Sequence, residues 1–313
     1  MIIAVTGLNT ASEPASGYGV LKSLKDCGDY DLVGLVYEPL ETCMYQSDLM
    51  KRVYLLPFPG KDSGKYLKRL SQIKSDTGMD ILIPNQHREI PFLIDHVSAL
   101  DGMGIKTLLP QKQSLRDIFK GEPGDKFKER SVSFRLPSTE GSDDRISVLS
   151  LGKSPVQNMN VFRNIKDDEF AIGLLADRNH QVAGSVSIKK LLTTPGGSTW
   201  MGLTIDDEEF NNVAEEIVAN TGWTGPMTIN MTRNERGIPC IRHVLPVFPD
   251  WINFAATAGM NLPAALVDII QGEHVPSVSR IIPGKLFVRM SIDVVTDIDR
   301  FGIFSLTGEL TYD

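Results

Sequence analysis

Short apolar runs that alternate with polar stretches in the first third of the chain constrain its fold most. They lie at residues 2–5, 32–36, 53–56 and 81–83, and one more at 106–109 precedes Pro110. A strand that is buried on both faces reads as a continuous apolar run, and helices between such strands cover both faces of a parallel sheet. We therefore predict a Rossmann-like parallel-sheet lobe over residues 1–110.

The length and charge of the chain limit what it can be. Its 313 residues exceed one typical domain of about 100–200 residues, so we expect two lobes. The net charge of −7, with no cluster of basic and aromatic residues, argues against nucleic acid as a partner. No apolar run approaches the ~18 residues that span a bilayer, and the start lacks the basic segment of a signal peptide. We expect a cytoplasmic protein without membrane contact, whose cysteines, Cys27, Cys43 and Cys240, are reduced thiols.

The second half of the chain has the patterns of an α+β lobe, expected over residues 161–275. Segments 169–175 and 181–192 read as strands, and the acidic first turn of 206–219 reads as a helix start. Strands at 226–232 and 239–245 flank a hairpin turn, and a helix follows at 263–270. We expect residues 276–313 to form a β-rich tail packed on this lobe. Residues 111–160 are expected to form a connecting region or a reduced central subdomain.

Several motifs together carry a resemblance to one family. They are VTGLNT at 5–10, SGYG at 16–19, IPNQHREI at 83–90, GDK at 124–126 followed by LPST, DDEFAIG at 167–173 and FPDWINFAATAGMNLP at 248–263. With them the chain resembles the ATP-grasp carboxylate-amine ligases, in particular the branch of the carbamoyl phosphate synthase large subunit. The resemblance implies an α/β fold with a Rossmann-like parallel-sheet N-terminal (pre-ATP-grasp) lobe and an α+β ATP-grasp-like C-terminal lobe.

The family's chemistry, as the resemblance implies it, is ATP-driven activation of a carboxylate, which requires magnesium held by hard oxygen ligands. The positions that match the family's metal ligands are Asn230, His243 and Leu245, and Val247 replaces an arginine. An amide, an imidazole and an alkyl group do not offset the charge of magnesium ions. We therefore expect no metal site and no cofactor. Strand alternation predicts that Arg242 points to the face opposite His243.

The family's central nucleotide-covering lobe is also expected to be reduced. Between Thr139 and Phe162 there are 22 residues. Two strands, a glycine-rich loop and a helix need roughly 35 residues. This stretch is therefore too short for a complete lobe.

Some nucleotide-binding positions nevertheless match the family. The resemblance implies a ribose contact for Glu169, an adenine hinge that includes Ile165, and phosphate contacts for Lys126, Lys189 and Lys190. The alternatives without a binding role are that Glu169 is an exposed charge at the start of a strand and that Lys126 caps a helix.

Two loops of the N-terminal lobe could contact a small substrate. Ser16, Gly17, Tyr18 and Gly19 precede a helix, where backbone N–H groups attract anions, although the glycines also suit a tight turn. Asn85, His87 and Glu89 follow the strand that ends at Pro84, at the sheet edge where open α/β sheets place ligands.

The leading hypothesis is a degenerate ATP-grasp protein, or pseudo-ligase, that acts as a non-catalytic binding or regulatory partner. Its partner would be an active ATP-grasp paralogue or a second copy of the chain. One alternative is an active ATP-dependent carboxylate-amine ligase that uses ATP and magnesium through relocated metal ligands or a partner subunit. Another alternative is a small-molecule sensor that uses the loops at 16–19 and 85–89.

Overall fold

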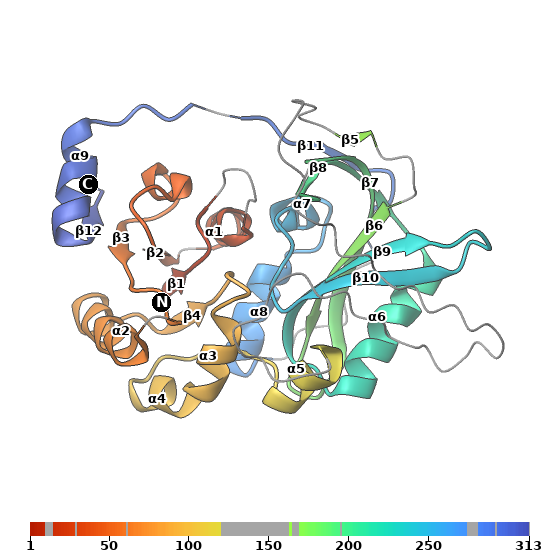
Figure 1. The fold of residues 1–313 in the computed structure, drawn as a ribbon, viewed down its shortest axis with the longest axis horizontal. Helices are drawn as coiled ribbons and strands as arrows, with labels where there is room; N and C mark the ends of the chain where they lie inside the picture. The colour runs from red at the N-terminus through yellow and green to blue at the C-terminus, as the bar shows by residue number, and fades with distance from the viewer. Residues whose placement is uncertain are drawn as a thin grey trace, which may run out of the picture.

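The computed structural model describes residues 1–9, 15–28, 30–60, 62–119, 163–164, 169–194, 196–273, 281–291 and 293–312. Within them the chain builds two β-sheets, one mainly parallel and one antiparallel. Figure 1 shows helix α8 (Leu262–Gln271) between these sheets. The predicted α/β class is confirmed. The predicted reduction of a central lobe, and most of the connecting region 111–160, lie outside the described residues.

The N-terminal sheet has the strand order β12-β3-β2-β1-β4. Its parallel strands coincide with the apolar runs: β1 (Ile2–Val5), β2 (Asp31–Val36), β3 (Arg52–Leu55) and β4 (Ile81–Ile83). Helix α1 (Gly17–Lys25) covers one face, and the other is covered by α2 (Ser63–Thr77), α3 (Ile90–Asp95) and α4 (Val97–Gly102). A short 3-10 helix, η1 (Thr42–Tyr45), follows β2. Both faces of the parallel strands are therefore buried, as continuous apolar runs require.

The second sheet has the order β10-β9-β6-β7-β8-β11, with neighbours antiparallel and the short strand β5 paired to β7. Its strands up to β10 are β5 (Arg163–Asn164), β6 (Glu169–Ala176), β7 (Val182–Thr193), β8 (Thr199–Ile205), β9 (Gly225–Arg233) and β10 (Pro239–Leu245). Helices α5 (Lys112–Phe119) and α6 (Glu208–Thr221) pack on one face. Asp207 caps α6 by accepting hydrogen bonds from the N–H groups of Glu209 and Phe210, at 3.1 and 3.4 Å, and Gly222 ends the helix in a left-handed conformation.

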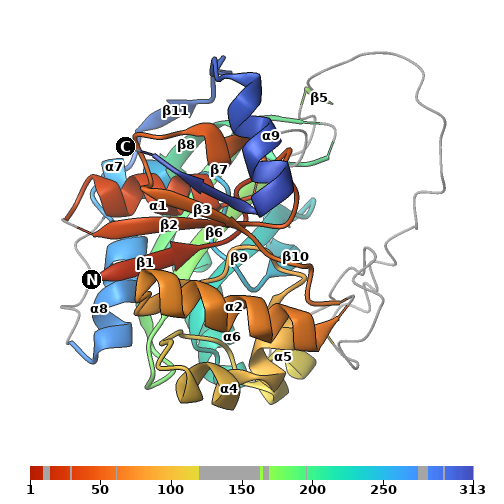
Figure 2. The same ribbon diagram turned by 90° about the vertical axis from the view of Figure 1, so that its left-hand side faces the viewer.

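A shared core joins the two sheets. Ile3 and Val5 of β1 and Val186 and Ile188 of β7 belong to one cluster of buried side chains that includes Leu266 of α8. Helix α7 (Ile252–Thr257) lies against α1, where a Cβ added to Gly19 would come within 2.8 Å of the Ile252 side chain. Figure 2 shows the same arrangement from the side of the N-terminal sheet. The two sheets therefore have fixed positions relative to each other.

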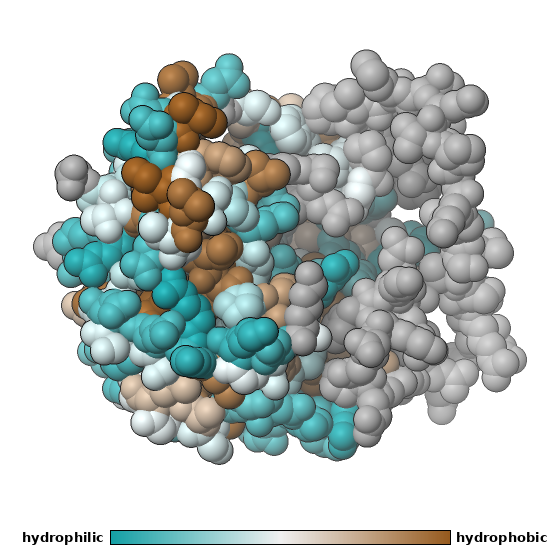
Figure 3. Space-filling model, turned by 60° about the vertical axis from the view of Figure 1, so that its left-hand side comes forward, coloured by the Kyte–Doolittle hydropathy of each residue, from teal (hydrophilic) through white to brown (hydrophobic). Residues whose placement is uncertain are grey.

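The C-terminal segment corrects the prediction of a β-rich tail on the second lobe. Strand β11 (Leu286–Val288) does pair with β8, but helix α9 (Ile298–Thr307) follows, and β12 (Glu309–Thr311) pairs with β3 of the N-terminal sheet. Figure 1 shows the long connection from β11 to α9. Figure 3 shows apolar surface on the side that carries α9, and Val295 and Leu306 are 96% and 90% exposed. The chain thus returns to its first sheet.

The apolar run at 106–109 was also interpreted wrongly as a strand. Lys106 forms a single bridge to Ile81, and the backbone then leaves the sheet. The carbonyl of Leu109 accepts a hydrogen bond from the Thr224 hydroxyl at 2.7 Å, so contact with the second lobe replaces strand pairing. Within the described parts of the chain, every helix is too short or too polar to span a bilayer.

Candidate functional site

One face of the antiparallel sheet carries the residues at the predicted metal positions. Ile229 and Met231 of β9 pack in the core beneath α6. Since side chains alternate along a strand, Thr228, Asn230 and Thr232 point to the other face, which we call the site face. On β10, His243 lies opposite Asn230 and Leu245 lies opposite Thr228. The structure therefore brings Asn230, His243 and Leu245 together.

The prediction that Arg242 points away from His243 is wrong. The β9–β10 register shifts between Ile241 and His243, which marks a β-bulge with Arg242 as the extra residue. The Arg242 Nε donates a hydrogen bond to the Thr232 hydroxyl at 3.0 Å, so the guanidinium lies on the site face. A bulge suspends strand alternation and places two successive side chains on one side of the sheet.

Lys189 and Lys190, which were both predicted as nucleotide contacts, point to opposite faces of β7. Lys189 lies over the ring of Phe170 at 5.9 Å, on the side of α6. Lys190 points to the site face and is 6% exposed. Its Nζ donates to Asn230 Oδ1 at 2.6 Å and makes a long contact of 3.4 Å with the Gly197 carbonyl. Of the two lysines, only Lys190 can serve this site.

Two buried imidazoles, His243 on the site face and His87 in the N-terminal lobe, are close enough to interact electrostatically. Burial, and then the charge of Lys190, lowers the pKa of His243. Burial lowers the pKa of His87, which follows β4, to about 4, and the charges of Arg88 and His243 act in the same direction. Both imidazoles are therefore neutral near pH 7.

Glu169 begins β6 opposite Thr232, on the site face. Its charge, like that of Asp250, favours the ammonium form of Lys190, although burial has the larger effect and lowers the lysine pKa. Lys126 and Ile165, the other predicted nucleotide contacts, lie outside the described residues.

Asp250 and Arg289 form an ion pair that the sequence gave no signal for, because they come from distant segments. Asp250 Oδ2 lies 2.8 Å from Arg289 Nη1, and Nη2 donates to the Asp250 carbonyl at 3.1 Å. Burial raises the pKa of Asp250, and Arg289 opposes that rise. The pair fastens the segment after β11 to the loop before α7.

Arg289→Met should therefore lower the free energy of unfolding by about 2 kcal/mol, because it leaves the Asp250 carboxylate buried without its partner. The value is below that of a fully buried pair, since the Arg289 side chain keeps 20% exposure. Urea denaturation measures the loss. The double variant Asp250→Asn/Arg289→Met should recover most of it, and an equal loss in both variants would contradict the buried-charge explanation.

The polar residues predicted to bind substrate in the N-terminal lobe mostly form hydrogen bonds within that lobe. The Ser16 hydroxyl donates to Asn85 Oδ1 at 3.0 Å, and the Asn85 amide donates to the Ile83 carbonyl at 3.0 Å. Glu89 is fully buried and accepts from Thr6, Tyr37 and the N–H of Gln86. Three of these residues therefore hold the strand ends in place, whereas His87 is near enough to His243 for a charge there to lower its pKa.

The SGYG segment was predicted to precede a helix, but Ser16 is the N-cap of α1 and Gly17, Tyr18 and Gly19 form its first turn, which is closely packed. A Cβ added to Gly17 would lie 2.3 Å from the carbonyl oxygens of Thr6 and Gly7. The Gly17 N–H donates to the Gly7 carbonyl at 3.0 Å, and Tyr18 packs partly buried against the shared core. Gly17 and Gly19 are thus required for close approach of the backbone to its neighbours.

The side chains on the site face do not fit magnesium. The Asn230 carbonyl oxygen is occupied by the Lys190 ammonium, Leu245 has no donor atom, and Asp250 is paired with Arg289. Among the described residues, no group of three histidine, cysteine or acidic side chains could hold a metal ion. Among the described residues of this face, a cation with octahedral oxygen preference finds no set of carboxylates that could together balance its charge.

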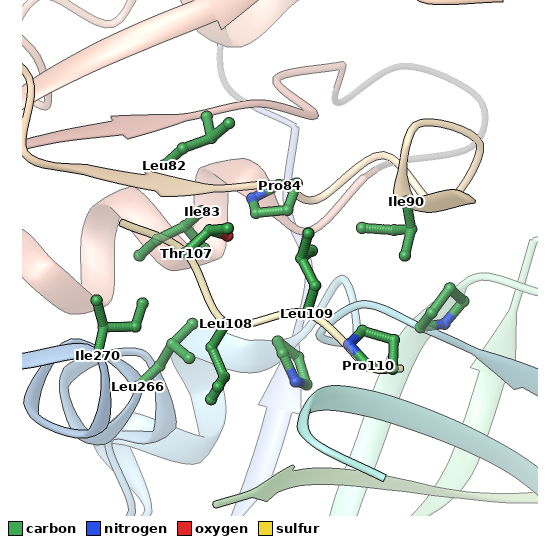
Figure 4. Close-up of a pocket in the computed structure, with 12 residues that line it drawn as sticks. Leu82, Ile83, Pro84, Ile90, Thr107, Leu108, Leu109, Pro110, Leu266 and Ile270 are labelled. Carbon is green, nitrogen blue, oxygen red and sulfur yellow. The ribbon is translucent and has the colours of Figure 1, made fainter. Parts of the chain in front are cut away.

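A cavity between the lobes does not provide an alternative site. Figure 4 shows it lined by apolar and proline side chains, among them Pro84, Pro110 and Leu266. Its volume of about 10 Å³ suits one water molecule and is far too small for a nucleotide or an amino acid.

No family model and no curated protein matches the sequence. The fold, however, is similar to solved structures. The biotin carboxylase of Campylobacter jejuni gives a TM-score of 0.56 at 10% identity, over 91% of this chain and 74% of that one. The L-amino acid ligase of Bacillus licheniformis gives 0.51 at 12% identity, over 86% and 74%.

The pyruvate carboxylase of Rhizobium etli gives a TM-score of 0.54 at 13% identity, and there the similarity covers 91% of this chain but only 28% of the carboxylase. These proteins are ATP-grasp enzymes, so the described chain has the ATP-grasp fold. At this level of identity the likeness concerns the fold alone. The assignment to the carbamoyl phosphate synthase branch stays a prediction.

Proposed function

We propose that this protein is a degenerate ATP-grasp protein that does not catalyse ATP-driven ligation and acts as a binding or regulatory partner. The observation that carries the proposal is the contact of 2.6 Å between the Lys190 ammonium and Asn230 Oδ1. A basic side chain therefore contacts the position at which the family resemblance implies a ligand for a metal cation. His243 and Leu245 beside it add no negative charge.

The active-ligase alternative requires carboxylates that could replace the missing ligands. The candidate acids are Asp250 and the pair Asp167 and Asp168. The pair lies outside the described residues, and the carboxylate of Asp250 is held by Arg289. The sensor alternative requires polar groups that are free to meet a ligand, whereas Ser16, Asn85 and Glu89 bond within the lobe. Both observations favour the non-catalytic proposal.

ADP release in the presence of magnesium and ATP tests the proposal. The purified protein should release no more ADP than a heat-inactivated sample, with glutamate, glycine or bicarbonate added as acceptor or donor. Magnesium-dependent ADP release by the protein alone would contradict the proposal. New turnover on mixing with an active ATP-grasp paralogue, beyond that paralogue's own rate, would instead identify the regulated partner.

A further inference from the structure

Lys190 is a buried lysine that forms no ion pair with any residue that the structure describes. Its short hydrogen bond goes to a neutral amide, and its second contact, to the Gly197 carbonyl, is long at 3.4 Å. An ammonium group has three N–H donors, so one direction is left unfilled by the described residues. Buried charges are normally paired, because an unpaired one is costly to remove from water.

The surroundings of Lys190 add further donors for an anion. His243 lies opposite the Asn230 that Lys190 contacts, and the β-bulge turns Arg242 to the same face. His87, from the other lobe, is near enough to His243 that a charge on His243 would lower the pKa of His87. The acids near Lys190 are Glu169 and Asp250, of which Asp250 already has an arginine partner.

We infer that Lys190 takes the role of a divalent cation and that the site face binds a phosphoryl oxyanion directly, without metal. This inference rests on the proposed function and names the ligand class of the same site. A phosphate group matches the site because its several oxygens can accept from a lysine and from imidazole N–H groups at once. The group could belong to free phosphate or to a nucleotide, and the two sources share this chemistry.

Isothermal titration in excess EDTA tests the inference, with inorganic phosphate, ATP, adenosine and acetate as probes. Phosphate and ATP should bind and compete for one site, and added magnesium should not tighten either. Adenosine and acetate should bind at least about tenfold more weakly. Tighter binding of ATP than of phosphate would identify a nucleotide as the source, and equal binding would identify the free anion.

The two adjacent lysines supply a matched pair of variants. Lys190→Met should weaken phosphate binding at least about tenfold, as expected for loss of one charge-assisted hydrogen bond. Lys189→Met, on the opposite face of the same strand, should leave it unchanged. Lys190→Arg keeps the cation and should restore part of the affinity. Far-ultraviolet circular dichroism confirms that each variant is folded.

Failure of the inference can be distinguished from failure of the proposed function. Binding that requires magnesium, equal loss in Lys189→Met and Lys190→Met, or no binding of phosphate or ATP in EDTA would overturn the inference. None of these results involves ADP release. Conversely, ATP turnover with intact metal-free phosphate binding would overturn only the proposed function.

Discussion

A variant with Asn230→Glu, His243→Glu, Leu245→Asn and Lys190→Met should bind Mn²⁺ at least about 100-fold more tightly than the parent protein. The three substituted strand positions lie opposite or beside one another on the site face. New carboxylate and amide oxygens there would supply the hard ligands and the negative charge that the parent lacks. Manganese is chosen because its binding is measured directly by electron paramagnetic resonance.

The Lys190 substitution in that variant is needed for a physical reason. In the parent protein the Lys190 ammonium donates a hydrogen bond to the Asn230 amide oxygen at 2.6 Å. If Lys190 were retained, it would form an ion pair with the carboxylate introduced at position 230. The triple variant that keeps Lys190 should therefore bind Mn²⁺ at least about tenfold more weakly than the quadruple variant. Equal affinities would contradict the idea that Lys190 replaces a metal. If the quadruple variant folds but does not bind Mn²⁺, positions 230, 243 and 245 do not correspond to the metal ligands of the family.

Local sequence patterns predicted those parts of the fold that depend on near neighbours. The buried strands β1 and β2 are continuous apolar runs, and the acidic start of α6 includes its cap, Asp207. Strand β8 was not expected because it follows a glycine- and threonine-rich loop and contains Gly202. Strand β12 could not be expected, because its partner β3 lies far away in the sequence and the two strands share only three residue pairs.

The site could be predicted only in part, for similar reasons. Successive side chains of a strand point to opposite faces, so the sequence alone predicts that Lys189 and Lys190 lie on opposite faces of the sheet. The orientation of Arg242 was not accessible, because a bulge leaves no clear mark in the residues that form it. The role of Arg289 was missed as well. Arg289 reaches Asp250 because strand β11, which precedes it, pairs with β8, and this pairing cannot be read from the local sequence.

Glu89→Ala should lower the free energy of unfolding by about 4 kcal/mol, because the substitution leaves several buried donors without an acceptor. The Glu89 carboxyl accepts from the hydroxyls of Thr6 and Tyr37, and the Gln86 N–H donates to it at 3.1 Å. These groups end β1 and β2 and begin the turn after β4, so the loss should extend to the whole parallel sheet. Urea denaturation measures it. Glu235→Ala, in the exposed hairpin turn, is the control and should change stability by less than about 0.5 kcal/mol.

Glu89 should also make stability depend on pH in the direction opposite to that of a surface carboxylate. Burial raises the pKa of Glu89 from 4.5 to about 7, against the lowering effect of the Thr6 and Tyr37 hydrogen bonds. Between these values the folded protein holds a proton that the unfolded chain has released, so stability falls as pH rises through the window. For Glu89 the fall should reach about 3 kcal/mol, at 1.36 kcal/mol for each pH unit.

Glu89→Gln removes this titration and should flatten the stability curve between pH 5 and pH 8. A part of the slope should remain, because burial also raises the pKa of Glu41 to about 7, where its carboxylate accepts from the N–H groups of Tyr37 and Leu8. Chemical denaturation at each pH gives both curves. If the parent protein and Glu89→Gln had parallel curves, Glu89 would have to be ionised in the folded state throughout, and the buried neutral acid would be ruled out.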